Sequence, residues 1–277
     1  VALDSSRDNA LRGLAGAYEK LGDGAAAEST YQQAIALRPQ YWAGYNSLGG
    51  FYFRQSRYSE ALKMFERVVQ LTPENFQGYS NMGALLIAQG QYSKSIDALE
   101  RSIEIRPTLE AYSNLGGAYF ALRRFDEAAQ MYQKGLTLDD RDSLIWGNLG
   151  DALYWTAGRR TEAAAAYRKA ISRSAPKLQV NPRDATLLAF VATYHAMVGD
   201  KSAALSHLNH ALDLAPKDAE IRFRAALVYN QLGDTEQTLS SLEKAIAAGY
   251  PPSAIRDTPD FDHLRDNPRV QTLLKKL

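Results

Sequence analysis

The sequence contains no cysteine among its 277 residues. Disulfide bonds and metal sites built from thiolates are therefore excluded. Long hydrophobic runs are also missing, since no stretch approaches the roughly 18 apolar residues of a membrane-spanning helix, and no signal peptide opens the chain. We therefore expect no membrane insertion and favour the cytoplasm as the compartment. Because the first residue is Val1, we expect the chain to be a fragment or a processed form.

An excess of charge of either sign is lacking as well. The chain carries 32 basic and 31 acidic residues, a formal net charge of +1, and its basic residues form no stripe. Binding to a nucleic-acid backbone requires a basic surface, so we expect no nucleic-acid partner. The hydrophobic and charged fractions, 45% and 23%, are those of an ordinary soluble protein.

What the sequence does contain is one short motif in several copies. YNSLGGFYF begins at Tyr45, and similar segments begin at Leu11, Tyr79, Tyr112 and Trp146: LRGLAGAYE, YSNMGALLI, YSNLGGAYF and WGNLGDALY. A loop that cradles phosphate is needed only once, whereas a motif that recurs at a regular interval predicts a repeat architecture. The glycines in these segments are therefore predicted to serve helix packing.

The repeats share a fixed order of small and large side chains. When Leu14, Leu48, Met82, Leu115 and Leu149 are aligned, seven repeats follow: 8–41, 42–75, 76–108, 109–142, 143–184, 185–218 and 219–252. One residue after the aligned position every repeat has glycine or alanine: Ala15, Gly49, Gly83, Gly116, Gly150, Ala192 and Ala226. Residues 1–7 are left as an N-terminal lead-in and residues 253–277 as a C-terminal cap.

Within a repeat the apolar spacing is helical. Residues at i, i+3, i+4 and i+7 form a stripe in the first half of repeat two, and a second stripe follows in its second half: Tyr45, Leu48, Gly49 and Tyr52, then Ala61, Phe65 and Val68. Between the stripes, other repeats place a glycine, which favours a helix C terminus: Gly22, Gly90, Gly199 and Gly233. Each repeat is therefore predicted to be two antiparallel helices, in which the small residue lets the axes approach and a bulky residue fills the space beside it.

Repeat length, the Leu-Gly pair, the small–large–small order and a closing proline resemble the tetratricopeptide repeat family over residues 8–252. The resemblance implies an all-α fold, a right-handed superhelical solenoid of seven antiparallel helix-pair repeats with a C-terminal capping helix. It also implies that the first helix of each repeat lines a concave groove. The tail after Pro252 is similar to that of C-terminal tetratricopeptide regions in bacterial signalling proteins.

Two segments depart from the repeat. The fifth repeat has roughly seven extra residues before Pro182, nearly two helical turns, so its second helix is expected to lengthen. Pro176 is expected to kink this extension or to start a separate turn. The expansion is either a tolerated surface insertion or a projecting ledge or seam between repeats. After the repeats, residues 269–277 are predicted to form a short helix, and Phe261 and Leu273 are expected to help cover the seventh repeat.

The sequence offers few candidates for chemistry. His207 and His210 are three residues apart on one predicted helix, but neither a cysteine nor an evident third ligand accompanies them. Gly116 and Gly117 are not followed by the Lys-Ser/Thr of a phosphate-binding loop. We therefore predict no enzyme activity, no metal site and no cofactor.

One face of the predicted first helices carries amides. Asn81, Asn114 and Asn148 occupy the same phase in successive repeats. An asparagine amide can donate to a carbonyl and accept from an N–H of a peptide backbone, and asparagine ladders of this kind line peptide-binding grooves in the family that the repeats resemble. The alternative is that these asparagines only bond neighbouring helices. Nearby small and aromatic positions are predicted to leave room and apolar surface for a guest: Gly50, Gly117, Phe53, Phe120, Tyr154 and Trp155.

These features predict a non-catalytic scaffold that binds an extended peptide segment of a partner protein in its groove. One alternative is the regulatory or sensory arm of a larger bacterial signalling enzyme, a kinase or cyclase, or of a transcription regulator. Another is a self-associating scaffold that pairs through the N-terminal repeat, because residues 1–7 are too short and too polar to cover that repeat.

Overall fold

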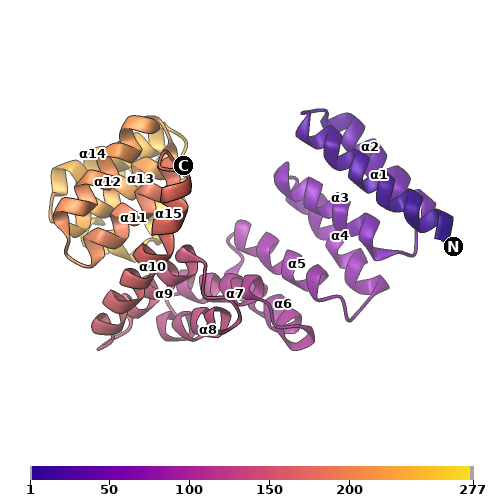
Figure 1. Cartoon of the computed structure of the whole chain (residues 1–277), viewed down its shortest axis with the longest axis horizontal. Helices are drawn as coiled ribbons and strands as arrows, with labels where there is room; N and C mark the ends of the chain where they lie inside the picture. Colours follow the sequence, from indigo (N-terminus) through magenta and orange to yellow (C-terminus); the bar gives the residue numbers. More distant parts are fainter. Residues whose placement is uncertain (1, 275–277) are drawn as a thin grey trace. The chain divides into compact units, whose positions relative to one another are not determined.

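The computed structural model describes residues 2–274, and every regular element in that range is helical (Figure 1). The chain divides into two compact units, residues 1–122 and residues 123–277. Unit 1 contains α1 (Ala2–Lys20), α2 (Gly24–Leu37), α3 (Trp42–Arg54), α4 (Tyr58–Leu71), α5 (Phe76–Ala88), α6 (Tyr92–Ile105) and α7 (Leu109–Ala121). Within it α1 packs on α2, α3 on α4 and α5 on α6, so the first three repeats are the predicted helix pairs.

Unit 2 continues the same pattern and then leaves it. It contains α8 (Phe125–Leu138), α9 (Ser143–Trp155), α10 (Arg160–Val180), α11 (Ala185–Met197), α12 (Lys201–Leu214), α13 (Ala219–Gln231), α14 (Thr235–Ala247), α15 (Pro252–Asp257), the 3-10 helix η1 (Pro259–Leu264) and α16 (Pro268–Leu274). Here α9 packs on α10, α11 on α12 and α13 on α14. The prediction of an all-α solenoid of helix pairs is confirmed. None of the helices within residues 2–274 has both the length and the hydropathy needed to cross a bilayer.

The predicted pairing of a small with a large side chain is confirmed inside the helix pairs. A Cβ atom added to Gly83 on α5 would lie 2.5 Å from Cγ of Leu99 on α6. A Cβ atom added to Gly150 on α9 would lie 2.5 Å from a ring carbon of Tyr167 on α10. Glycine therefore lets the paired helices approach more closely than any larger residue would allow at these positions.

The turn inside each repeat uses a left-handed backbone conformation. As predicted, glycine provides it in most repeats, with φ of +81°, +70°, +84° and +78° at Gly22, Gly90, Gly199 and Gly233. Ser56 and Arg123 hold the same place in repeats two and four, with φ of +57° and +60°. For a residue with a Cβ atom this conformation costs roughly 1–2 kcal/mol, so other interactions must offset it.

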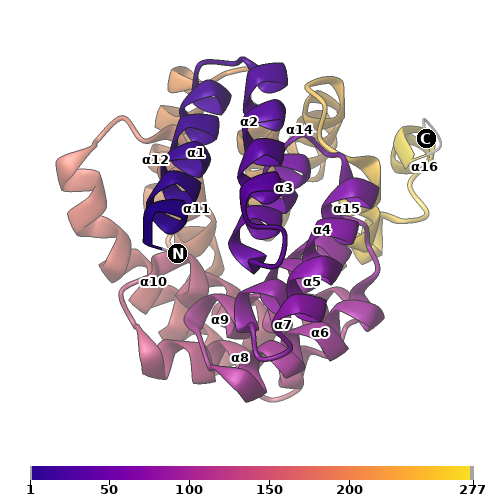
Figure 2. The ribbon, with the colours of Figure 1, turned by 90° about the vertical axis from the view of Figure 1, so that its right-hand side faces the viewer.

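The start of the first repeat and the expanded fifth repeat differ in detail from the sequence-based prediction. The predicted lead-in is not a separate segment, because α1 begins at Ala2 and the stretch up to Ala10 contains no glycine or proline that would break a helix. In the fifth repeat the second helix lengthens as predicted, since α10 has 21 residues and α12 has 14. Figure 2 shows the last turns of α10 reaching beyond the neighbouring helices of unit 2. No separate turn starts at Pro176, which lies exposed inside the continuous α10.

The tail after the seventh repeat forms three short helices, where the sequence predicted one. Their apolar residues join a core cluster with α13 and α14: Ile255, Phe261, Leu264, Val270 and Leu273 pack with Phe223, Leu239 and Leu242. The tail thus covers the end of the last helix pair, as a solenoid requires. Residues 275–277, the end of the predicted final helix, lie outside the described residues.

Candidate functional site

The predicted groove residues lie on first helices and outside the core. Each of them is half-buried: Gly50 and Phe53 on α3, Asn81 on α5, Asn114, Gly117 and Phe120 on α7, and Asn148, Tyr154 and Trp155 on α9. Half-buried positions on one helix face are held by their neighbours and still accessible. We call the faces of these helices that carry such residues the first-helix surface of each unit.

Asn81 already has a partner within unit 1. Its Nδ2 donates to Oδ1 of Asn46 on α3 at 2.8 Å, so this amide ties two successive first helices together. That is the kind of bond that the alternative interpretation of the asparagines predicted. Because an amide has two donors and two acceptor lone pairs, Asn81 keeps further capacity for a peptide backbone.

An ion pair lies beside Gly50 on unit 1. A Cβ atom on Gly50 would lie 3.3 Å from Nη1 of Arg54. Arg54 donates two hydrogen bonds to Glu19 on α1, at 2.5 and 2.8 Å. The hydrogen bond from Arg54 lowers the pKa of Glu19 below its usual value, so this carboxylate stays ionised at neutral pH. Unit 1 therefore presents a charged pair at this point of its first-helix surface.

Asn114 and Asn148 contrast with Asn81. Both side chains are half-buried, and within residues 2–274 neither amide forms a hydrogen bond. A partly buried amide without a partner loses part of its hydration and gains nothing in return. These two groups are therefore available for the backbone of a guest, one in each unit.

Two of the aromatic residues in the predicted groove lie together at the end of α9. Tyr154 and Trp155 pack edge to face, with ring centroids 5.4 Å apart. The guanidinium carbon of Arg160 lies 4.7 Å from the centroid of Tyr154, and the ring of Phe125 lies 6.1 Å from that of Trp155. Tyr154, Trp155 and Arg160 line a hollow of about 290 Å³ on unit 2.

An acidic pair beside these rings was missed by the sequence-based prediction. Asp151 on α9 accepts a hydrogen bond from the hydroxyl of Tyr167 on α10 at 2.7 Å. Asp260 on η1 lies close enough to the indole of Trp155 for the indole to lower the pKa of this carboxyl, against the larger effect of burial. The two carboxyls lie near enough for the charge of Asp151 to act on the titration of Asp260.

Both acids titrate above the usual range of aspartate. Burial, with repulsion from Asp151 as the next cause, raises the pKa of Asp260 to about 7. Burial also raises the pKa of Asp151, although the hydrogen bond from Tyr167 and the charge of Arg224 act in the opposite direction. Arg224 is held over the ring of Phe190, with 3.8 Å between the guanidinium carbon and the ring centroid. A partly neutralised acidic site thus lies on the first-helix surface of unit 2.

An asparagine of unit 2 does hold a peptide backbone, but it is Asn230 on α13. Its Nδ2 donates to the carbonyl oxygen of Asp260 at 3.0 Å. Two departures from the repeat pattern signal this site in the sequence. Asp151 stands where other repeats have Gly50 and Gly117, and Asn230 stands in the row that holds Phe120.

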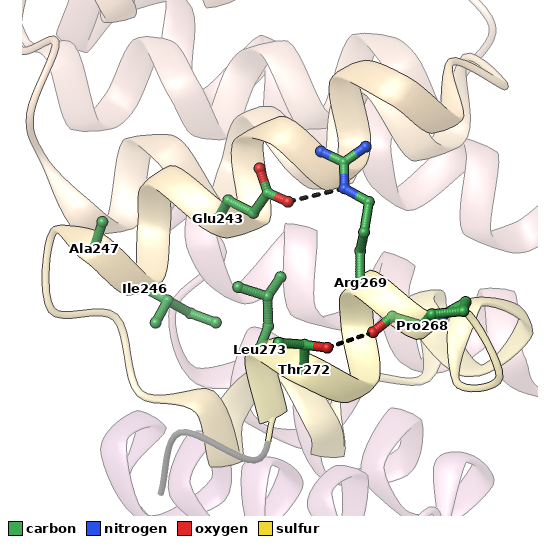
Figure 3. Close-up of a pocket in the computed structure, with 7 residues that line it drawn as sticks. All are labelled: Glu243, Ile246, Ala247, Pro268, Arg269, Thr272 and Leu273. Carbon is green, nitrogen blue, oxygen red and sulfur yellow. Dashed lines mark hydrogen bonds and ion pairs between the residues drawn. The ribbon is translucent and has the colours of Figure 1, made fainter.

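Two other features lie apart from this surface. The rings of His195 and His207 stack with centroids 5.4 Å apart, yet the described residues contain no group of three or more His, Cys, Asp or Glu side chains suited to a metal ion. A hollow of about 650 Å³ is lined by α14 and α16 (Figure 3). Its wall includes Ile246 and Leu273, and Arg269 at its edge binds the carboxylate of a glutamate on α14. It belongs to the covered end of the solenoid.

Comparison with known proteins identifies the family. A family model described as the Cilia and flagella-associated protein 70 C-terminal domain matches residues 2–260. No curated protein sequence matches the chain significantly. Among solved structures, a tetratricopeptide repeat protein from Parabacteroides merdae is similar over 97% of this chain and 98% of its own, with a TM-score of 0.63 and 18% identity.

Two further structures share the fold. The matched chain in the APC/C hetero-tetramer Cut9-Hcn1 has a TM-score of 0.63 and 19% identity, covering 89% of this chain but only 44% of that one. PilF of Pseudomonas aeruginosa has a TM-score of 0.61 and 17% identity, covering 79% of this chain and 96% of its own. At these identities the likeness concerns the fold alone. The chain belongs to the Cilia and flagella-associated protein 70 C-terminal domain family and is a tetratricopeptide repeat protein.

Proposed function

We propose that the chain is a non-catalytic scaffold that binds an extended peptide segment of a partner protein on its first-helix surfaces. Tetratricopeptide repeats generally serve as protein-interaction scaffolds, and the finer assignment rests on one observation. The amides of Asn114 and Asn148 are half-buried and have no hydrogen-bonding partner within residues 2–274. Such groups cost free energy unless a ligand satisfies them, and a peptide backbone offers both the acceptor and the donor that an amide needs.

Aromatic residues supply the second element of the proposed site. Phe53 and Phe120 in unit 1, and Tyr154 and Trp155 in unit 2, are half-buried on the same helices as the asparagines or on adjacent first helices. Peptide grooves combine main-chain hydrogen bonds for affinity with apolar pockets for side-chain selectivity. This combination suits an extended, modestly hydrophobic segment.

Selection of peptides from a random library on the full chain tests the proposal. Peptides that bind should lose about tenfold in affinity, one good hydrogen bond or more, when Asn81→Ala and Asn114→Ala are combined for unit 1 or when Asn148→Ala is introduced for unit 2. The matched control is Gln70→Ala, which removes an exposed amide from the second helix α4. Helicity should be retained in every variant, and a lower melting temperature is expected only with Asn81→Ala, which removes the hydrogen bond to Asn46. Unchanged affinity in the asparagine variants would show that these residues only support the helices.

Self-association is a second candidate function, favoured by exposed apolar side chains on α1 and in the turn after it. Leu14 on α1 is 47% exposed, and Leu21 in the turn is 81% exposed. Light scattering across a concentration range should show growth in mass that Leu14→Ser with Leu21→Ser abolishes. A constant monomer mass would exclude this role. The regulatory arm of a bacterial signalling protein stays a prediction, which the sequence of the full-length protein tests.

A further inference from the structure

The tail of the chain occupies part of the first-helix surface of unit 2 in the way that a bound peptide would. We call residues 259–264, which form η1, the docked segment. The carbonyl oxygen of Asp260 accepts a hydrogen bond from Asn230 at 3.0 Å, and the carboxyl of Asp260 lies close enough to the indole of Trp155 for the indole to act on its pKa. A main-chain group and a side chain of the same residue are therefore both recognised, one from α13 and one from α9.

The next two residues add an aromatic anchor and a charged clamp. Phe261 is 3% exposed, and its ring meets that of Phe223 edge to face with centroids 6.0 Å apart. Phe223 in turn stacks on Tyr250 at 4.2 Å. Asp262 accepts two hydrogen bonds from the guanidinium of Arg123, at 2.6 and 2.8 Å. Three consecutive residues, Asp-Phe-Asp, thus each have their own receptor on unit 2.

Covering the end of the solenoid does not require these polar contacts. Ile255 on α15 and Val270 and Leu273 on α16 already pack in the cluster that contains Leu239 and Leu242 of α14. Burial of apolar surface against the last repeat is sufficient for an end cap. The contacts that Asn230 and Arg123 make with the docked segment are therefore additional to what the cover requires.

The docked arrangement also has features that weaken it. The carboxyl of Asp260 lies near that of Asp151, and two acids enclosed together repel each other when both are ionised. The ion pair between Arg123 and Asp262 is solvent-accessible, with side chains 41% and 37% exposed, and such pairs contribute little to stability. A segment held in this way can exchange with a competitor that offers the same groups.

We propose that this surface of unit 2, formed by Arg123, Trp155, Phe223 and Asn230, is a binding site for an acidic–aromatic segment of a partner protein, with a carboxylate on each side of a central aromatic residue. The docked segment occupies the site until such a partner displaces it. This inference rests on the proposed function, and it specifies one class of peptide and its regulation by the chain's own tail.

The test uses a fluorescein-labelled peptide with the sequence of residues 257–265, DTPDFDHLR, and measures its binding to the full chain by fluorescence polarisation. Asp262→Ala removes the clamp from the tail and leaves the receptor intact, so the peptide should bind this variant up to about fivefold more tightly than the unmodified chain. Adding Arg123→Ala should reverse that gain by about the same factor. The matched control Asp266→Ala removes an exposed tail aspartate outside the docked segment and should bind like the unmodified chain.

Hydrogen exchange of residues 259–264 verifies that Asp262→Ala loosens the tail, and circular dichroism verifies that the helices remain. A loosened tail without any gain in peptide binding would overturn the inference and show the segment to be a fixed cap. A tail that stays protected in Asp262→Ala overturns it as well, since the segment then does not exchange. If light scattering instead shows dimers that the free peptide dissociates, the site is occupied by the tail of a second copy of the chain, and the assignment of a partner protein is wrong.

Failure of this inference can be distinguished from failure of the proposed function. Library peptides whose binding depends on Asn81 and Asn114 in unit 1 would keep the scaffold function even if the DTPDFDHLR peptide never bound. Conversely, binding of this peptide that is insensitive to the asparagines would place recognition on unit 2 alone.

Discussion

Replacing Gly83 with alanine tests whether helix pairs are held together by close small–large contacts. Glycine in the interior of a helix is less favourable than alanine by up to about 1 kcal/mol, so the substitution would stabilise α5 if nothing else changed. The structure predicts the opposite sign. A Cβ atom at Gly83 would lie 2.5 and 2.7 Å from Cγ and Cδ2 of Leu99, which has no exposed surface.

The magnitude follows from the two opposing effects. Cγ is two bonds from Cα of Leu99, so rotation about the Cβ–Cγ bond does not move it away from the added Cβ atom, and α5 and α6 must separate. Overpacking of this kind costs about 1–3 kcal/mol, against a gain of at most about 1 kcal/mol from helix propensity. After subtraction of a gain of about 1 kcal/mol, Gly83→Ala should lower the free energy of unfolding by up to about 2 kcal/mol.

Gly13→Ala provides the matched control in the same unit. Gly13 lies inside α1, and an added Cβ atom would meet no atom within 4 Å, so this variant should be more stable by up to about 1 kcal/mol. Urea unfolding followed by circular dichroism compares the midpoints, because a solenoid need not unfold in one step. If Gly83→Ala raised the midpoint as Gly13→Ala does, the close approach of α5 and α6 would be refuted.

Three further outcomes follow. The pKa of Asp260, raised to about 7 by burial and by Asp151, exceeds the roughly 3.9 of an unfolded chain. The contribution of Asp260 to stability should therefore be greatest at low pH and fall between about pH 4 and 7, by at most about 1.4 kcal/mol per pH unit. The difference in unfolding free energy between the unmodified chain and Asp260→Asn, measured by urea titrations at successive pH values, should show this slope. Asn75→Ala removes the side chain that caps α5 by accepting from the N–H of Gly78 at 2.9 Å, and thermal melting should show a loss of about 1 kcal/mol. Ser56→Gly relieves a left-handed residue at φ +57°, and the same assay should show a gain of about 1 kcal/mol.

The repeats could be predicted from the sequence because their determinants are local and periodic. A stripe such as Leu48, Gly49 and Tyr52 encodes a helix and its packing face within a few residues. The pairing of Gly83 with Leu99 recurs at the same spacing as Gly49 with Phe65, so one frame describes successive helix pairs. The glycines in the turns additionally predicted where first helices end.

The docked segment could not be predicted in the same way. Its contacts join residues far apart in sequence, such as Arg123 and Asp262, which are 139 positions apart, and no period relates them. The availability of Asn114 and the engagement of Asn81 are likewise decided by neighbours on adjacent helices, such as Asn46. The sequence places these amides on one face but does not determine which of them the fold already satisfies.

Arg123 shows how a departure from the repeat carries information about recognition. The turn before α8 requires a positive φ, which glycine provides without strain at Gly90. Arg123 adopts φ +60° there, at a cost of about 1–2 kcal/mol, and its exposed ion pair with Asp262 returns at most about 1 kcal/mol. Stability therefore does not account for arginine at this position. A planar guanidinium that donates two hydrogen bonds selects a carboxylate, so Arg123 contributes selectivity for acidic segments on the first-helix surface of unit 2.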